Sequence, residues 1–245
     1  MSEGPLGEWA RPVTIGIVGG AVLFALGIRK EAHARTDRQA LGLGPEIELH
    51  VPHVSIAPTI DGELDEAAWL RAPARTGVFI GADGAAARPF SDARLLWDHK
   101  RLYLALYAAD EDIRVAKAAA DGPLWTGDAF GIVLVKADGT RYVIDVGPSG
   151  VVTDGKSAPG VTNEIDYAWQ SGAQVATDID GTLDDPRDRD EEWVIEMSIP
   201  LASLGMEGLS GERIGFGVRR CDTVDKKRVC GSFGQPTTRS VLVFE

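Results

Sequence analysis

Residues 92–110 decide the fold, and they read DARLLWDHKRLYLALYAAD. In the first half, Ala93, Leu95 and Trp97 occupy every second position, and residues 102–107 then alternate leucine with tyrosine or alanine. Two runs of this period joined by a short polar break are typical of a β-hairpin. Because neither side of the hairpin is fully polar, we expect it in the centre of a β-sandwich rather than at an exposed edge.

Short β-like runs continue along the chain before and after this hairpin. The spacing predicts about eleven strands, with Asp138-Gly139 as a hairpin turn, and therefore an all-β fold, an antiparallel β-sandwich over residues 46–245. The expected strands are residues 46–51, 78–80, 93–98, 102–109, 130–136, 141–146, 173–177, 193–199, 213–220, 228–233 and 241–244. Short helical turns are expected at residues 64–70 and 201–204.

The charge is distributed unevenly along the 245 residues, whose formal net charge is −12. Residues 1–45 contain five basic and four acidic side chains, so residues 46–245 carry a net charge of −13. An acidic body of this size repels phosphate backbones, and we therefore expect no nucleic-acid partner.

The N-terminal region contains one long apolar segment. Residues 12–28, PVTIGIVGGAVLFALGI, hold no charged side chain and would extend about 26 Å as a helix, enough to cross a hydrocarbon core. The alternative is a cleaved signal peptide, since Ala32-His33-Ala34 has the form of a cleavage site, but the residues before the apolar run lack the net positive charge of such a peptide.

We therefore predict a single membrane anchor in front of the sandwich. The predicted order is a short tail at residues 1–11, a transmembrane helix at 12–29, a stalk at 30–45 and the sandwich at 46–245. Small side chains at Gly16, Gly20 and Gly27 would let a second membrane helix, and so another membrane-protein subunit, pack closely against the anchor in the lipid bilayer.

Two cysteines, Cys221 and Cys230, are the only ones in the chain. They flank a predicted hairpin, where facing positions on paired strands are within disulfide reach. The alternative is a pair of reduced core thiols. A disulfide requires an oxidising compartment, so the prediction favours an extracytoplasmic body, although the basic residues after the apolar segment point the other way by the positive-inside rule.

Four motifs in the sandwich occur in a familiar order. Together they resemble the family 9 carbohydrate-binding module and the wider DOMON-like group, from about residue 51 to the C-terminus. The resemblance implies a β-sandwich that works outside the cytoplasm and binds glycan ends or, in one branch, a b-type haem. The motifs are Thr59-Ile60-Asp61-Gly62-Glu63-Leu64-Asp65-Glu66-Ala67-Ala68-Trp69, Leu96-Trp97-Asp98 with Leu102-Tyr103, Leu124-Trp125 with Asp128, and Trp193-Val194-Ile195-Glu196 with Ile199-Pro200.

The resemblance implies a ligand site at Trp125 and Asp128. The tryptophan of this motif stacks on a sugar in glycan-binding members, and an aromatic face suits the axial C–H face of a sugar. The other sugar contacts of those members map to Gly131, Val143 and the region around Phe233, so most of the sugar-site residues are absent here. The alternative for Trp125 is a residue kept for packing, as we expect for the tryptophans at 69, 97, 169 and 193.

Other cofactors have weaker support in the sequence. Haem would need a pair of axial ligands from methionine and lysine, and no spacing selects such a pair. Asp178, Asp180 and Asp184 concentrate oxygen ligands, which makes them a candidate calcium loop, although we favour a solvated acidic loop. The histidines have no nucleophile motif around them, so we expect no catalytic residues and no enzyme activity.

These observations lead to one function hypothesis and two alternatives. The first is a non-catalytic accessory subunit of a larger membrane complex, photosynthetic or respiratory electron-transfer machinery included, with its body in the periplasm or another extracytoplasmic space. One alternative is a cell-surface module that recognises glycan through Trp125. The other, a haem-binding redox subunit, we consider the weakest.

Overall fold

A computed structural model of the chain describes residues 46–71, 73–161, 164–224, 227–234 and 240–245. The chain divides into two units, residues 1–45 and 46–245, and only the second falls in the described part. The predicted tail, transmembrane helix and stalk, with Gly16, Gly20 and Gly27, lie outside the described residues. Within the described residues, no helix is both long enough and apolar enough to span a bilayer.

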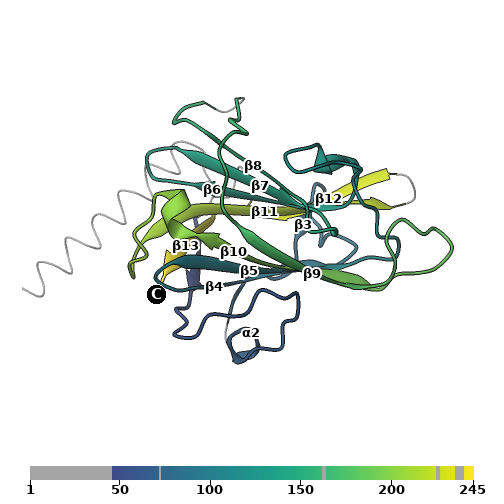
Figure 1. Ribbon diagram of the computed structural model, residues 1–245, viewed down its shortest axis with the longest axis horizontal. Helices are drawn as coiled ribbons and strands as arrows, with labels where there is room; N and C mark the ends of the chain where they lie inside the picture. Colours follow the sequence, from purple (N-terminus) through teal and green to yellow (C-terminus); the bar gives the residue numbers. More distant parts are fainter. Residues whose placement is uncertain (1–45, 72, 162–163, 225–226, 235–239) are drawn as a thin grey trace, which may run out of the picture. The chain divides into compact units, whose positions relative to one another are not determined.

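The hairpin predicted at residues 92–110 forms the middle of a five-stranded antiparallel sheet (Figure 1). Its strands pair in register, with Leu95 opposite Leu104, and the second of them also pairs with the strand that contains Trp193. The central position predicted for the hairpin is therefore confirmed. In spatial order the strands are β2 (Ala74–Arg75), β4 (Ser91–Trp97), β5 (Arg101–Ala109), β10 (Glu192–Pro200) and β9 (Gln174–Asp180).

The second layer is an eight-stranded sheet. Its main path runs β1 (Ile47–Val51), β13 (Ser240–Phe244), β11 (Arg213–Val224), β6 (Ala129–Val135), β7 (Arg141–Val146) and β8 (Val152–Ser157). Off this path, β12 (Lys227–Phe233) pairs with β11 and with β3 (Ile80–Gly81). The pairing of β1 with β13 is parallel, so the prediction of an antiparallel sandwich holds for the other strands but not for this edge.

Strand β8 was not expected from its sequence, VTDGKS, because it has no apolar alternation. Its outward residues are covered by loops instead of solvent. The Thr153 hydroxyl donates to the Gly122 carbonyl at 2.6 Å, and a Cβ at Gly155 would meet Ile165 Cγ2 at 2.5 Å. Local hydrogen bonds and close backbone contact thus replace the hydrophobic pattern by which strands are recognised.

The core lies between the two sheets and is built from their alternating inward side chains. Trp97 stacks on Phe244 with ring centroids 4.9 Å apart, and Phe130 meets Trp193 edge to face at 5.0 Å. Trp69, Trp97 and Trp193 are 1–2% exposed or fully buried, and Trp169 packs against the core from its edge. The predicted β-sandwich is confirmed.

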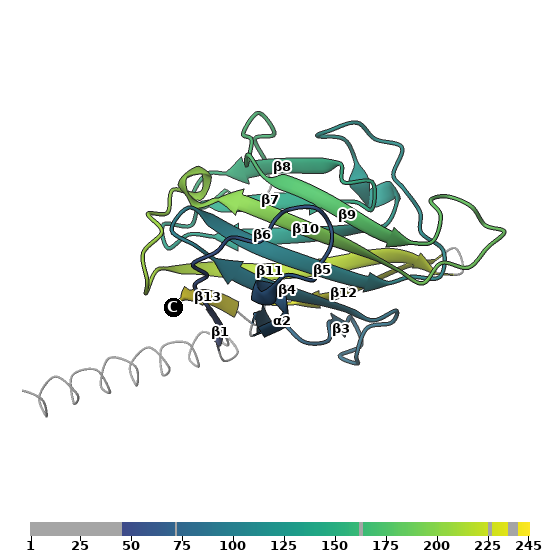
Figure 2. The same cartoon turned by 60° about the horizontal axis from the view of Figure 1, so that its bottom comes forward.

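A second apolar cluster covers the outer face of the five-stranded sheet. Leu96, Tyr103 and Ala105 lie on that face, and Trp69 packs on them from the short helix α2 (Ala67–Arg71). Figures 1 and 2 show α2 and its loop on the outer side of β4 and β5. This cover explains why neither side of the hairpin at residues 92–110 is polar.

One buried carboxylate attaches this cover to the sheet. Glu196, on the outer face of β10, is fully buried and accepts hydrogen bonds from Trp69 Nε1 at 2.9 Å and from the backbone N–H groups of Asp61 at 3.0 Å and Gly62 at 3.1 Å. Burial raises the pKa of Glu196, although these donors oppose the shift. Two sequence motifs far apart in the chain, around Trp69 and around Glu196, are therefore two halves of one contact.

The two cysteines face each other on neighbouring strands. Cys221 of β11 is opposite Cys230 of β12, and the two form a disulfide with Cα atoms 4.1 Å apart. Closing a loop of this length stabilises a fold by about 2–3 kcal/mol in the chain-entropy model. The bridge therefore fastens β12 to β11.

Candidate functional site

Trp125 lies in the short 3-10 helix η1 (Leu124–Thr126), just before strand β6. Its side chain is 55% exposed, whereas the neighbouring Leu124 is buried. Gly127 ends the turn and packs tightly, since a Cβ there would meet the backbone N of Ala116 at 2.3 Å. The turn is thus held from behind while the indole stays accessible, and Trp125 is not a packing residue.

A small, shallow recess opens beside this indole on the outer face of the eight-stranded sheet. Trp125 forms one side, and Gly131, Asp145, Arg219 and Arg228 contribute to the rest. The enclosed space has room for about one water molecule, far less than the roughly 300–1,000 Å³ of pockets that enclose drug-sized ligands. An aromatic face beside a few charged groups at so shallow a recess suits a ligand that stacks on the surface and is not enclosed.

Gly131 makes this recess possible because it has no side chain. It lies opposite Asp145 on one neighbouring strand and Arg219 on the other. A Cβ at Gly131 would meet Asp145 Oδ1 at 2.5 Å and Arg219 Nε at 2.7 Å. The two charged side chains therefore meet over the glycine, with Arg219 Nη2 and Asp145 Oδ1 3.7 Å apart.

Among the charged side chains of the recess, Asp145 is shielded from solvent at 23% exposed, whereas Arg219 and Arg228 are exposed. Burial raises the pKa of Asp145, while the positive charge of Arg219 opposes that shift. Burial also lowers the pKa of Arg228, whose Nη1 donates to the Gly127 carbonyl at 2.9 Å. Arg228 therefore connects the β11–β12 hairpin to the turn that carries Trp125.

Asp128, the other residue predicted to bind ligand, is fully buried. Its carboxyl oxygens accept hydrogen bonds from the backbone N–H of Arg114 at 2.6 Å and of Thr223 at 3.2 Å. These bonds tie the loop before η1 and strand β11 to the start of β6. Asp128 therefore acts on the recess indirectly, by positioning Trp125, and direct ligand contact is not consistent with its burial.

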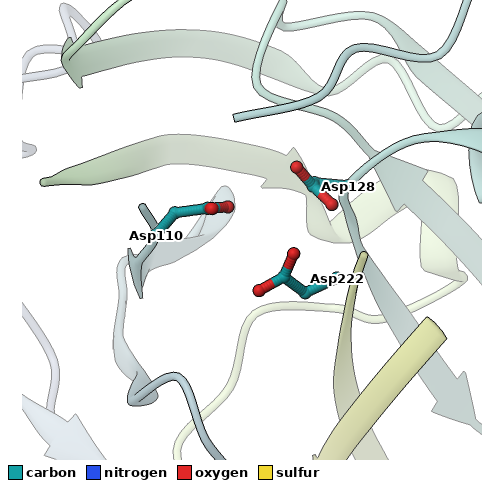
Figure 3. A group of neighbouring side chains, drawn as sticks. All are labelled: Asp110, Asp128 and Asp222. Carbon is teal, nitrogen blue, oxygen red and sulfur yellow. The ribbon is translucent and has the colours of Figure 1, made fainter. Parts of the chain in front are cut away.

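Asp128 belongs to a cluster of three buried carboxyl groups, which Figure 3 shows converging from three separate segments. Asp110, Asp128 and Asp222 each contribute one carboxylate oxygen, and these oxygens lie within 4.8 Å of one another. Arg220 is 3% exposed and donates from Nη2 to Asp110 at 2.6 Å and to Asp222 at 3.0 Å. Trp193 Nε1 also donates to Asp110 at 3.0 Å.

This cluster is arranged as a hydrogen-bonded anchor and not as a cation cage. A guanidinium already occupies the position next to two of the carboxylates, and backbone donors bind the third. Burial, with the nearby negative charges of Asp110 and Asp222, raises the pKa of Asp128 to about 8. A neutral Asp128 removes one negative charge from the cluster.

The raised pKa of Asp128 predicts a particular pH dependence of stability. An unfolded aspartate has a pKa of about 3.9, so between about pH 4 and pH 8 the folded chain holds a proton that the unfolded chain releases. The contribution is therefore fully present below the unfolded pKa and is lost as pH rises toward the folded pKa. Denaturant unfolding from pH 5 to pH 9 should show the wild type losing stability relative to Asp128→Asn, at up to about 1.4 kcal/mol per pH unit. Parallel curves for the two proteins would contradict this assignment.

The three residues predicted to bind calcium do not come together. Asp178 and Asp180 are exposed on β9 with one residue between them, and Asp184 accepts a bond from the Val115 backbone N–H at 3.0 Å. Across the described ranges, Asp110, Asp128 and Asp222 are the one group of three such side chains whose ligand atoms converge. The aspartates of this segment lie on strand β9 and in the turns that follow it.

Sequence reasoning missed Asp145, Arg219 and Arg228. Val143, which the resemblance placed in the site, lies on the same strand two residues before Asp145. Phe233 lies against the core and contacts Phe216 with ring centroids 6.2 Å apart. Alternation marks residues 141, 143 and 145 as outward, but only the register of three strands shows which outward residues share a recess.

The fold and the recess define a β-sandwich domain with a candidate ligand site, and comparison with known proteins gives its family. A family model described as "Carbohydrate family 9 binding domain-like" matches residues 60–233. The chain belongs to this family of carbohydrate-binding domains. No match is found among the curated proteins.

Solved structures of similar fold come from two bacteria. A protein from Bacteroides uniformis proposed to bind carbohydrate has a TM-score of 0.63 at 15% identity, over 81% of this chain and 99% of that chain. A family 9 carbohydrate-binding module from Caldicellulosiruptor kristjanssonii in complex with cellotriose has a TM-score of 0.55 at 16% identity, over 81% of this chain and 93% of that one. The same module in complex with glucose has a TM-score of 0.56 at 15% identity, over 81% and 95%. At these identities the likeness shows the fold alone.

The family assignment corrects the function hypothesis. An accessory subunit of a membrane electron-transfer complex is wrong, because the family is one of carbohydrate-binding domains. The family favours the alternative, glycan recognition. The hypothesis rested on the missing sugar contacts at Gly131, at Val143 and around Phe233, whereas charged side chains from other positions line the recess.

Proposed function

We propose that residues 46–245 form a non-catalytic carbohydrate-binding module that stacks one terminal sugar unit on Trp125, with the charged side chains of the recess beside it. The observation that carries the proposal is an indole 55% exposed at a recess that also contains a carboxylate and two guanidinium groups. An aromatic face takes the C–H face of a sugar, and charged groups at the rim bond its hydroxyls. Family membership supports this reading, and so do the cellotriose and glucose complexes of a module with the same fold.

The arrangement of residues around the recess supports ligand binding without catalysis. The Gly127 N–H donates to the Leu124 carbonyl next to Trp125, and the Gly127 carbonyl accepts from Arg228 Nη1. The platform is thus ordered before the ligand arrives, which limits the entropy lost on binding. The acid group of the motif, Asp128, is buried and engaged by two backbone donors. It is therefore in no position to exchange protons with a bound sugar.

We also propose that the module works in an extracytoplasmic space, the periplasm included. The Cys221–Cys230 disulfide supports this placement, because such bridges persist in oxidising compartments.

Replacing Trp125 by alanine is the direct test of the proposed function. The full-length chain is screened by isothermal titration calorimetry against neutral and acidic oligosaccharides, cellotriose among them. Trp125→Ala should weaken binding of the best ligand by about 30-fold or more, as expected for a central aromatic contact worth at least 2 kcal/mol. Phe90→Ala is the matched control, because Phe90 is an exposed aromatic residue of the other sheet's edge, 45% accessible. Equal affinity of Trp125→Ala and wild type, or no sugar bound by wild type, would rule out the proposal.

A further inference from the structure

The hydrogen-bonding groups of the recess are mostly donors. Arg219 and Arg228 each carry a guanidinium with five N–H groups and no acceptor. One of these, Arg228 Nη1, bonds a backbone oxygen of the protein. Against them the recess offers one carboxylate, Asp145, whose side chain is 23% exposed. A neutral sugar presents hydroxyls that both donate and accept, so this imbalance would leave guanidinium donors unused.

The two guanidinium groups also repel each other. Burial and then the positive charge of Arg219 lower the pKa of Arg228, while the carboxylates of Asp128, Asp222 and Asp145 raise it. Arg219 has a counter-ion in Asp145 at 3.7 Å, in an exposed and weak geometry. Both guanidinium groups are largely exposed to solvent, so their remaining N–H groups are accessible to a bound anion.

The absence of a side chain at Gly131 strengthens this reading. A Cβ there would crowd the Asp145 and Arg219 side chains as they now lie, so the glycine lets both side chains lie across this position. Arg228 reaches the same recess from β12, held at Gly127 next to Trp125. An aromatic platform flanked by two guanidinium forks is suited to a ring that carries an anionic substituent.

We propose that the recess selects a negatively charged terminal sugar, whose carboxylate or sulfate group lies between Arg219 and Arg228 while its ring stacks on Trp125. This inference rests on the proposed function, because it names the class of ligand for the same recess. A carboxylate matches the planar guanidinium fork in two parallel bonds, and a sulfate offers three acceptor oxygens to the same donors. Asp145 stays paired with Arg219 and excludes a second anion.

The test uses three matched trisaccharides with the full-length chain. They are cellotriose, the same trisaccharide with its terminal C6 oxidised to a carboxylate, and the same trisaccharide sulfated at that position. By calorimetry at 20 mM NaCl, an acidic trisaccharide should bind about 10- to 100-fold more tightly than cellotriose, as expected for charge-assisted hydrogen bonds. The preference should shrink at 300 mM NaCl because salt screens exposed charges. The tighter of the two acidic ligands identifies the anionic group.

Arginine variants then show where the preference arises. Arg219→Gln and Arg228→Gln should each reduce the acidic-over-neutral ratio to about 3 or less, and Arg228→Lys should keep part of it, since it retains the charge but not the fork. Arg187→Gln is the control, because Arg187 is 85% exposed and pairs with Asp185 away from the recess. If cellotriose binds as tightly as the acidic ligands and Trp125→Ala loses all three, the inference is overturned and the proposed function stands. If none of the three binds to wild type, the proposed function itself fails.

Discussion

Replacing Arg220 by methionine is expected to destabilise the sandwich by about 3–5 kcal/mol at pH 7, because it leaves two buried carboxylates without their cation. Asp110 and Asp222 are 2% and 3% exposed, and both lie within 3.0 Å of Arg220 Nη2. Arg220 Nη1 also donates to the Ala109 carbonyl at 2.9 Å. Methionine can fill much of the space but supplies none of these bonds.

The effect should be specific to the buried position. Guanidinium chloride unfolding, followed by tryptophan fluorescence, measures the loss in wild type and variant. Arg187→Met, which removes an exposed arginine from an ion pair with Asp185, should unfold as wild type does. Adding Asp222→Asn to Arg220→Met should recover part of the loss, because one of the two unpaired charges is then gone. A loss no larger than that of Arg187→Met would show that the cluster is not an anchor.

The buried carboxylate cluster around Arg220 explains the spacing of Trp125 and Asp128 in the sequence. Trp125 and Asp128 stand three residues apart, which suggests two groups on one ligand. The structure separates them, with Trp125 exposed and Asp128 buried beneath it and bonded to Arg114 and Thr223. The spacing of a motif records that both residues are needed, but burial decides which of them a ligand can reach.

The fold was more predictable than the site for a physical reason. The β4–β5 hairpin is local, and its alternation specifies both the strands and the faces they bury. The parallel pairing of β1 with β13 joins chain segments almost 200 residues apart, and no local pattern encodes it. The recess has the same difficulty, since Gly131, Asp145 and Arg219 meet only through the pairing of β11 and β7 with β6.

The aspartates at 178, 180 and 184 show the opposite error. They are close in sequence, and closeness in sequence predicted a shared ion. Strand β9 exposes Asp178 and Asp180, while Asp184 bonds the backbone of Val115 in a separate loop. A cluster that is dense along the chain can therefore be dispersed by the fold, whereas Asp110, Asp128 and Asp222, far apart in sequence, are brought together by it.

Replacing Glu196 by alanine should cost about 3–4 kcal/mol of unfolding free energy, since it orphans three donors at once. The indole N–H of Trp69 and the backbone N–H groups of Asp61 and Gly62 all bond its carboxylate, and an unsatisfied buried donor costs about 1–3 kcal/mol. Gly62 adds to the cost of any rearrangement. Its φ is +99° and a Cβ there would meet the Thr177 backbone carbonyl carbon at 2.8 Å, so the segment fits the sheet in one position.

The loss should be concentrated in the cover of the five-stranded sheet. Hydrogen exchange should accelerate at Asp61, Gly62 and the Trp69 indole, with little change at the η1 turn that carries Trp125 on the other sheet. Glu196→Gln, which keeps one acceptor oxygen, should fall between alanine and wild type. Glu192→Ala is the matched control from the same strand, because the partly exposed Glu192 bonds one hydroxyl, that of Tyr107. If hydrogen exchange accelerated uniformly over both sheets, Glu196 would stabilise the sandwich as a whole. Residues 54–71 would then be part of its core and not a separately attached cover.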